Sequence, residues 1–430
     1  MKTVIMAGGR GTRIASVASD IPKPMIPICG KPVLEHELEC LREQGFTDII
    51  LTVGHLGQLI TDYFGDGSQF GVHIEYYTEQ TPLGNAGALF KLKDKLTDDF
   101  LLLNADSVFD VDFGRFVDYH NQCGGLATIF THPNSHPYDS GLVITDNNCA
   151  VSQWLTKEDA RPAYYRNRVN AGLHVLSPVL LEKEISSEKV DLDRQLLKPL
   201  AGTGKLFAYS SPEYVKDMGT PERYRAVCRD FESGLVRSRN LSHPQKAVFL
   251  DRDGTVNRYV GFLRSADEFA LLPGADEAIR KINSSSFLAI VVTNQPVIAR
   301  GEVTVAQLDE IHNKMETMLG KSGAYIDGLY YCPHHPDGGF EGEVSELKIQ
   351  CDCRKPKPGM IFQAAEDFHI DLAASWMVGD SRSDIQCGIN AGCRTVLIGE
   401  SSQDCGQDYT AASLSEAVQI ILEVDENAHQ

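Results

Sequence analysis

The chain has 430 residues and a formal net charge of −19 at neutral pH, a length that suits about two or three domains. The acidic balance disfavours nucleic acid and anionic membranes as partners. The sequence has no apolar run of about 18 residues that would predict a membrane span, and a strand rather than a signal peptide is predicted right after Met1 and Lys2. Most of the eleven cysteines lie alone in apolar segments, as in reducing compartments. We therefore expect a globular protein of the cytoplasm.

The first half of the chain alternates predicted strands and helices, which is typical of a mostly parallel α/β sheet. A stretch at 234–246, rich in Arg, Ser and Asn, is predicted as a linker between domains at 1–233 and 247–430. The predicted strands are Thr3–Ala7, Asp48–Val53, His73–Tyr77 and Phe100–Leu103, and the predicted helices are Pro32–Gln44, Leu56–Phe64 and Pro221–Ser233.

A glycine-rich turn, Gly8-Gly9-Arg10-Gly11-Thr12-Arg13, follows the first predicted strand. It does not fit a dinucleotide-binding fingerprint, because Ile14 replaces the third glycine, and it lacks the Gly-Lys-Ser/Thr of a Walker loop. Its N–H groups can still face an anion, and the rigid Pro-Lys-Pro segment that follows projects Lys23. A structural turn with solvated arginines is the alternative interpretation.

The glycine turn and Pro-Lys-Pro together resemble the sugar-1-phosphate nucleotidyltransferases, over about residues 1–230. The resemblance implies that a nucleoside triphosphate is held by the turn and by two cations. It also implies base contacts in the segment 79–88, for which a Pro-Gly turn before a helix is the alternative. The implied residues are Gly8, Gly9, Gly11, Thr12, Arg13 and Lys23 for the triphosphate, and Gln80 and Gly84 for the base.

Asp106 follows a buried-looking predicted strand, at the sheet edge where α/β proteins bind ligands. The resemblance implies that Asp106 and the distant Asp217 ligate Mg²⁺, and two carboxylates suit that hard cation. It further implies that the sugar and its phosphate contact Gly141, Lys157, Asn170 and Gly172. Thr156 departs from the family, which usually has Glu before the lysine, so recognition of the sugar hydroxyls is expected to differ.

The second half opens on an apolar strand at 248–250 that delivers Asp251 and Asp253 to a turn. Side chains two apart leave a strand on the same side. One carboxylate can then attack phosphorus while the other protonates the leaving oxygen, with Mg²⁺ between them. Thr293 ends the next predicted strand and can hydrogen-bond the phosphoryl group. A capped strand-to-turn junction is the alternative.

Two close pairs of metal-binding side chains lie further on, Cys332 with His334 and Cys351 with Cys353. Three thiols and an imidazole fit tetrahedral Zn²⁺, and four protein ligands indicate a structural ion. His335 is an alternative ligand, and unliganded reduced cysteines are the alternative interpretation. The remaining predicted elements are the helices Ala275–Asn283 and Ser413–Val424, the strands Phe287–Val292 and Trp376–Val378, and a frayed tail at 425–430.

The second half resembles the haloacid dehalogenase (HAD) superfamily, from residue 247 to about 424. The resemblance is carried by the aspartate pair, the threonine at a strand end, the Arg-Lys-Pro segment and the Gly-Asp-x-x-x-Asp motif. The cysteine cluster resembles the branch of heptose bisphosphate and histidinol-phosphate phosphatases. The resemblance implies Asp251 as nucleophile, Asp253 as acid/base and Thr293 as phosphate donor. Lys355 neutralises the phosphoryl charge, with Lys357 an alternative on spacing. Also implied are Asn294 and Arg354 at the substrate, Asp251, Asp253 and Asp380 as Mg²⁺ ligands, and Asp384 as a further candidate.

The predicted fold class is therefore α/β with two Rossmann-like domains, a GT-A-like mixed sheet followed by a HAD-like parallel sheet. The segment 16–25 most resembles heptose 1-phosphate guanylyltransferases. These resemblances imply a bifunctional enzyme of nucleotide-activated heptose biosynthesis that uses phosphorylated heptose, GTP, Mg²⁺ at both sites and structural Zn²⁺. The alternatives are a hexose-1-phosphate nucleotidyltransferase fused to a phosphatase for another substrate, or a regulatory protein that keeps both folds. A homo-oligomer is left open.

Overall fold

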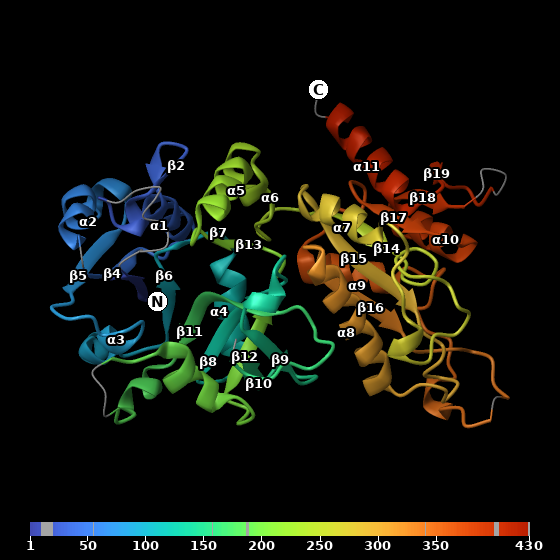
Figure 1. The fold of residues 1–430 in the computed structure, drawn as a ribbon, viewed down its shortest axis with the longest axis horizontal. Helices are drawn as coiled ribbons and strands as arrows, with labels where there is room; N and C mark the ends of the chain where they lie inside the picture. The colour runs from blue at the N-terminus through green and yellow to red at the C-terminus, as the bar shows by residue number, and fades with distance from the viewer. Residues whose placement is uncertain are drawn as a thin grey trace. The chain divides into compact units, whose positions relative to one another are not determined.

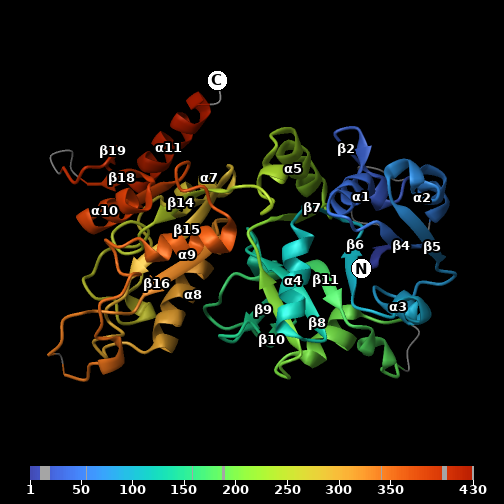
Figure 2. The same ribbon diagram turned by 180° about the vertical axis from the view of Figure 1, so that it is seen from behind.

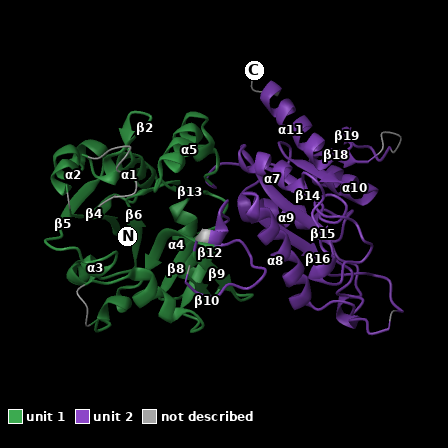
Figure 3. Cartoon of the chain, viewed as in Figure 1, with its two compact units in different colours: residues 1–132, 141–156, 169–240 green, residues 133–140, 157–168, 241–430 purple. Residues whose placement is uncertain are grey.

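The computed structural model describes residues 1–9, 20–54, 56–156, 158–185, 189–339, 341–399 and 404–428. The chain divides into two compact units, which are described one at a time (Figure 3). Unit 1 comprises 1–132, 141–156 and 169–240, and unit 2 comprises 133–140, 157–168 and 241–430. Two short excursions therefore belong to unit 2, although the residues on either side of them belong to unit 1.

The described part of unit 1 is built on a nine-stranded mixed sheet. Strands β6-β1-β4-β5 are parallel, β11 joins β6 in the antiparallel sense, and β12 pairs parallel with β8. The strands are β1 Thr3–Ala7, β4 Asp48–Val53, β5 His73–Thr78, β6 Phe100–Asn104, β8 Ala127–His132, β9 Leu142–Thr145, β10 Val151–Leu155, β11 Val169–Leu176 and β12 Leu206–Ser210.

Apolar side chains that alternate along these strands fill one core on each face of the sheet. Helices α1, α2 and α4 cover one face, while α3 and short helical turns cover the other. The helices of unit 1 are α1 Val33–Glu43, α2 Gly57–Phe64, α3 Gly87–Lys91, α4 Phe113–Cys123, α5 Pro221–Glu232 and α6 Leu235–Ser238. Single turns lie at Lys23–Met25, Ser68–Phe70, Lys93–Lys95, Pro178–Glu182, Leu192–Leu197 and Lys198–Leu200.

Two small ribbons complete unit 1. Strands β2 (Pro27–Ile28) and β3 (Lys31–Pro32) pair just before α1. Strands β7 (Ser107–Asp110) and β13 (Tyr214–Asp217) pair antiparallel, with Asp217 opposite Ser107. The second ribbon brings the end of the unit's chain back to the carboxyl end of β6.

Unit 2 contains a six-stranded sheet in its described residues, and every pairing in it is parallel. The order is β16-β15-β14-β17-β18-β19. The strands are β14 Lys246–Leu250, β15 Phe287–Asn294, β16 Gly328–Cys332, β17 Trp376–Gly379, β18 Arg394–Ile398 and β19 Tyr409–Ala411. The predicted fold class, with a mixed sheet followed by a parallel one, is confirmed.

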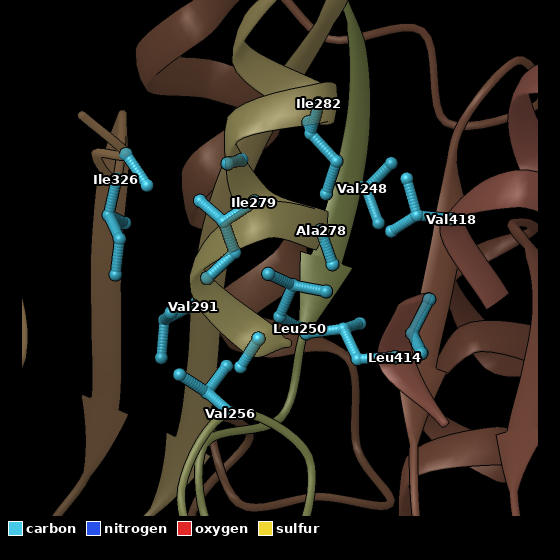
Figure 4. Packing of buried hydrophobic residues seen from close by; sticks show 14 of the residues in the cluster. Val248, Leu250, Val256, Ala278, Ile279, Ile282, Val291, Ile326, Leu414 and Val418 are labelled. Carbon is cyan, nitrogen blue, oxygen red and sulfur yellow. The ribbon is translucent and has the colours of Figure 1, made fainter. Parts of the chain in front are cut away.

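Helices flank the sheet of unit 2 on both faces (Figure 1, and from behind in Figure 2). Helices α7, α8 and α11 pack on one face through the core shown in Figure 4, where Ile279 and Ile282 of α7 meet Val248 and Val291. Helices α9 and α10 cover the other face. The helices are α7 Ala275–Asn283, α8 Val305–Lys321, α9 Gly359–Phe368, α10 Arg382–Ala391 and α11 Leu414–Ala428, with single turns at Pro137–Asp139, Ala266–Glu268 and Ser345–Leu347.

The prediction of a frayed tail from residue 425 is wrong for its first four residues, because α11 continues to Ala428. Asp425 accepts a hydrogen bond from Lys246 Nζ at 2.7 Å, which fixes the last turns to the sheet. The segment predicted as a linker contains α6 and the first residue of β14. None of the helices in the described ranges is long and apolar enough to cross a membrane.

Two candidate active sites

Asp251 leaves the end of β14 and is 7% exposed. Its N–H donates to Val378 O of the neighbouring β17 at 2.9 Å, which aligns the turn with the strand that leads to Asp380. Gly254 has a φ of +92°, and a Cβ there would lie 1.9 Å from Asp380 Oδ2. Glycine is therefore required where the two acidic turns approach each other.

Lys355 reaches the same point from the loop after the cysteine cluster. Its Nζ lies 2.5 Å from Asp251 Oδ1 and 2.6 Å from Asp384 Oδ1, and it donates to Val292 O at 2.9 Å. Burial disfavours the charged lysine, but the two aspartates outweigh that effect and raise its pKa. Burial also raises the pKa of Asp251, although Lys355 partly offsets this. The ammonium group of Lys355 thus forms ion pairs with both Asp251 and Asp384.

The carboxylates of Asp251, Asp380 and Asp384 have oxygens within 4.8 Å of one another. Asp384 also caps α10, since its Oδ2 accepts the N–H of Ser381 at 3.0 Å. Oxygen ligands at this spacing fit Mg²⁺, which takes a few carboxylates and keeps several waters. Bound there, Mg²⁺ would neutralise charge on a phosphoryl group.

Asp253 faces a different set of partners. Arg252, which is 0% exposed, donates to both of its oxygens at 2.8–3.2 Å. Asn257 and Gln295 donate to it at 3.0 and 2.9 Å. Burial opposes ionisation, but these donors outweigh it and hold the pKa of Asp253 below its usual value. On the far side, Arg252 Nη1 lies 3.0 Å from Nε2 of the buried His312.

The other expected phosphatase residues surround this pair. Thr293 is buried, and its Oγ1 accepts from Gln295 Nε2 at 2.8 Å. Asn294 makes two hydrogen bonds of 3.0 and 3.1 Å with the backbone of Lys355, so its side chain holds the lysine loop. Arg354 donates to His334 O at 3.3 Å. Lys357 is exposed and pairs with Asp352 at 2.9 Å.

Cys332, His334, Cys351 and Cys353 converge, with sulfur–sulfur and sulfur–Nδ1 separations of 3.3–3.6 Å. Four ligands about 2.3 Å from a tetrahedral Zn²⁺ would be about 3.8 Å apart. The residues therefore fit the metal with a small expansion. His335 lies outside this group, and its Nδ1 accepts the N–H of Asp337 at 3.2 Å.

The nucleotidyltransferase residues that are described gather in unit 1. Lys23 Nζ lies 2.8 Å from Asp106 Oδ2. The β7–β13 ribbon places Asp217 opposite Ser107, next to Asp106 in the chain. Arg223 donates to Asp217 at 2.8 and 3.1 Å, and with the Gly219 N–H it lowers the pKa of Asp217 against the effect of burial. The backbone segments of Asp106 and Asp217 are adjacent, since the N–H of Met218 donates to Asp106 O at 3.4 Å. Each carboxylate pairs with a cation, and two carboxylates suit the hard cation Mg²⁺.

Two of the expected sugar residues, Asn170 and Gly172, lie near the end of β6. A Cβ on Gly172, whose φ is +81°, would lie 2.7 Å from Asn104 Nδ2 at the end of β6. Asn170 Oδ1 accepts the N–H of Gly172 at 3.0 Å. Gly141 lies beside Trp154, since a Cβ there would be 3.3 Å from Trp154 Nε1.

On the nucleotide side, Gly8 follows β1 and approaches Glu79, because an added Cβ would lie 3.4 Å from that carboxyl. Burial raises the pKa of Glu79. Gly84 has a φ of +83°, and a Cβ there would lie 2.4 Å from Val190 O. Gly9 and Gln80 are exposed. Gly11, Thr12, Arg13 and Lys157 lie outside the described residues.

Sequence reasoning missed several partners of these residues. Arg252 stands between the two aspartates of the motif, but no role was assigned to it, and Asn104, Arg223 and His312 were not assigned roles either. Gln295 had a usable signal, because it stands two residues after Thr293 and directly follows β15. Asp384 was named only as a further candidate, and its contact with Lys355 required the tertiary structure.

The folds and sites define a nucleotidyltransferase joined to a HAD phosphatase. A family model described as nucleotidyl transferase matches residues 2–233, and one described as HAD-hydrolase-like matches 352–417. The chain belongs to the nucleotidyl transferase family over its N-terminal half, and its C-terminal half carries a HAD phosphatase domain.

Three known proteins illustrate these similarities. The D-glycero-beta-D-manno-heptose-1,7-bisphosphate 7-phosphatase of Escherichia coli strain K12 is 43% identical over 152 residues, which are 35% of this chain and 78% of that protein. A UTP–glucose-1-phosphate uridylyltransferase of Synechocystis sp. is 35% identical over 243 residues, which are 53% of this chain and 62% of that protein. The structure of HddC from Yersinia pseudotuberculosis complexed with GMP-PN is 28% identical, with 54% of this chain and 99% of that chain covered, and a TM-score of 0.47.

Proposed function

We propose that this chain catalyses two successive steps of nucleotide-activated heptose synthesis. Unit 2 removes the distal phosphate of D-glycero-D-manno-heptose 1,7-bisphosphate, and unit 1 transfers GMP from GTP to the resulting heptose 1-phosphate, with release of pyrophosphate. The observation that carries the proposal is the 43% identity with a heptose-1,7-bisphosphate 7-phosphatase, which covers 78% of that relative.

In the phosphatase step, an oxygen of Asp251 attacks phosphorus and the bond to the sugar oxygen breaks. Asp253 donates a proton to that oxygen. Asp253 then takes a proton from the water that cleaves the aspartyl phosphate, which releases inorganic phosphate and regenerates Asp251. Lys355, 2.5 Å from Asp251, neutralises charge on the transferring group. Thr293 supplies a hydroxyl donor at the adjacent strand end. Mg²⁺ held by Asp251, Asp253 and Asp380 would add positive charge, with Asp384 as a further candidate ligand.

In the transfer step, a phosphate oxygen of the sugar attacks the α-phosphorus of the nucleotide, and pyrophosphate leaves. The protein supplies position and charge rather than a nucleophile. Lys23 and Arg13 bind the triphosphate, while Asp106 and Asp217 would hold Mg²⁺. Gly141, Lys157, Asn170 and Gly172 bind the sugar phosphate, and the glycine turn with Gln80 and Gly84 binds the nucleotide.

A second candidate for unit 1 is a hexose-1-phosphate nucleotidyltransferase. It is favoured by the 35% identity with a UTP–glucose-1-phosphate uridylyltransferase over 243 residues. The two candidates differ in both base and sugar, so a substrate panel separates them.

The test supplies the purified chain with four nucleoside triphosphates against heptose 1-phosphate, glucose 1-phosphate and mannose 1-phosphate, and scores pyrophosphate. In parallel, phosphate release is measured from heptose 1,7-bisphosphate and histidinol phosphate. Among the transferase substrates we expect GTP with heptose 1-phosphate to give the highest kcat/KM. Among the phosphatase substrates we expect heptose 1,7-bisphosphate to give the highest kcat/KM. A preference for UTP with glucose 1-phosphate would favour the second candidate, and equal hydrolysis of both phosphatase substrates would contradict the first.

A further inference from the structure

Arg252 of unit 2 stands between the two aspartates of the strand-end motif and is 0% exposed. An arginine is rarely this buried unless its donors are paired. Its Nη2 donates to both oxygens of Asp253 at 3.0 and 2.8 Å, and its Nε donates to Oδ1 at 3.2 Å. Its Nη1 lies 3.0 Å from Nε2 of His312. Because its side chain is closed off from solvent, Arg252 acts through these two neighbours and not on a substrate.

His312 belongs to α8 and is 5% exposed. A guanidinium group only donates, so Nε2 of His312 accepts and the neutral ring carries its proton on Nδ1. Burial, together with the positive charges of Arg252 and Arg166, holds the pKa of His312 well below its usual value, which agrees with a neutral ring. The ring also packs near Tyr331 of β16, with the two ring centroids 5.7 Å apart. The acceptor for Arg252 is therefore fixed within the folded unit.

The other contacts of Asp253 distinguish its two oxygens. Oδ1 accepts from two nitrogens of Arg252 and from Asn257 Nδ2, so three donors hold it. Oδ2 accepts from Arg252 Nη2 and from Gln295 Nε2, and the same Gln295 nitrogen donates to Thr293 Oγ1 at 2.8 Å. Oδ2 thus shares a donor with the threonine that is expected at the phosphoryl group.

Proton transfer requires the carboxyl group to lie within hydrogen-bond reach of the leaving oxygen. A guanidinium that contacts both oxygens of a carboxylate fixes the rotation of that carboxylate. Since the guanidinium is planar and rigid, a third contact outside the pair fixes the plane itself, and His312 supplies that contact. The orientation of Asp253 therefore depends on a histidine that does not touch it.

We propose that Arg252 and His312 are positioning residues of the phosphatase reaction, which hold Asp253 with Oδ2 turned to the leaving oxygen. The proposal rests on the proposed hydrolysis and on the role of Asp253 in it. In that step the bond between phosphorus and the sugar oxygen breaks, its electron pair stays on the sugar oxygen, and this oxygen takes the proton of Asp253. A displaced Arg252 leaves the carboxyl chemically intact but wrongly placed.

The test uses His312→Leu in the full chain. This variant removes the acceptor and leaves a buried N–H of Arg252 without a partner, so the guanidinium has to move. We expect kcat/KM for heptose 1,7-bisphosphate to fall about 10²-fold, which is the usual contribution of a placed acid. If His312→Leu does not fold, Arg252→Lys replaces it, because an ammonium keeps the charge but cannot hold Asp253 and His312 in one plane.

Two matched variants separate the hydrogen bond from the bulk of the side chain. His312→Gln places an acceptor oxygen at the position of Nε2 and should restore kcat/KM to within about threefold of the wild type. His243→Leu removes an exposed histidine of unit 2 and should change nothing. Equal losses in His312→Leu and His312→Gln would contradict a role for the acceptor.

The leaving group reports whether the loss concerns proton transfer. The sugar oxygen needs a proton to leave, whereas p-nitrophenyl phosphate releases a stable phenolate that needs none. In His312→Leu, kcat/KM for p-nitrophenyl phosphate should therefore stay within about threefold of the wild type. A loss of similar size on both substrates, or an unchanged kcat/KM for the heptose bisphosphate in the folded variant, overturns the proposal.

A crystal structure of His312→Leu reports the geometry independently of activity. The guanidinium of Arg252 and the carboxylate of Asp253 should both be displaced from their positions in the wild type, and an Asp253 carboxylate that has not moved overturns the proposal. Asp253→Asn tests the proposed function itself. It should reduce hydrolysis of the heptose bisphosphate much more than hydrolysis of p-nitrophenyl phosphate, and equal effects would overturn the acid role of Asp253 and the positioning role with it.

Discussion

The two candidate sites differ in how deeply their charges are buried. In unit 2 the side chains of Lys355 and Asp384 are each 2% exposed, and the side chain of Asp251, which pairs with Lys355, is 11% exposed. In unit 1 the side chains of Asp106 and Asp217 are 47% and 44% exposed, and each pairs with one cation. Water screens the second set and hardly reaches the first.

This difference indicates two modes of assembly. Exposed ion pairs contribute at most about 1 kcal/mol each, so Lys23 and Arg223 can release their aspartates when metal and triphosphate arrive. Buried charges are stable only when paired, and loss of one partner costs about 3–5 kcal/mol. We therefore expect the fold alone to assemble the charged group of unit 2, and bound ligands to complete the charged group of unit 1.

The largest effect is expected at the proposed nucleophile. Asp251→Asn keeps the size of the side chain but removes the attacking oxygen, so phosphatase kcat should fall by at least about 10⁴-fold. Nucleotide-sugar formation from heptose 1-phosphate should be unchanged, and formation from the 1,7-bisphosphate should stop. Product formation from both substrates is the measurement. Nucleotide sugar made from the bisphosphate by pure Asp251→Asn would show that the steps are not sequential.

Removal of one cysteine ligand should unfold much of unit 2. In Cys351→Ser the loss of metal binding should lower the stability of unit 2 by about 4 kcal/mol or more. Elemental analysis should find one zinc per wild-type chain, and denaturant unfolding should show the shift. Cys149→Ser, at an exposed cysteine outside the cluster, is the matched control. The structural metal would be ruled out if the purified wild-type protein contained no zinc and unit 2 were still folded in the denaturant experiment.

The stability cost of removing a lysine measures the contrast in burial directly. Lys355→Met leaves two buried carboxylates without their cation and should cost unit 2 about 3 kcal/mol. Lys23→Met removes an ion pair whose carboxylate is 47% exposed to water, and it should cost unit 1 less than about 1 kcal/mol. Urea unfolding of both variants gives the two values. If Lys355→Met and Lys23→Met lowered the free energy of unfolding equally, the two sites would not differ in how strongly burial couples their charges to stability.

The effect on activity should be smaller at the transferase carboxylate than at Asp251. Asp106→Ala removes a proposed magnesium ligand and should lower kcat/KM for nucleotidyl transfer by about 10²-fold. Phosphate release from heptose bisphosphate should not change. Assays of both activities on the same preparation supply the control, and a parallel loss of phosphatase activity would argue that Asp106 acts through folding.

The sequence anticipated the features that depend on local order along the chain. Asp251, Thr293 and Asp380 stand at ends of parallel strands, and such ends meet at one sheet edge. The cysteine cluster was readable because its ligands come in two close pairs. The fold class followed from the alternation of strands and helices. The residues that complete each site by contacts across the fold could not be predicted from that alternation.

What the sequence by itself determined is therefore the pair of α/β units, the cysteine cluster and the order of the charged motifs, because strand periodicity and ligand spacing are local properties. Only the tertiary structure decided that Lys355 lies between Asp251 and Asp384. It alone assigned residues 133–140 and 157–168 to unit 2. Lys355 and Asp251 are 104 positions apart in the sequence, and Arg168 and Glu316 are 148 positions apart. Such partners are selected by burial, shape and charge once the sheets have formed.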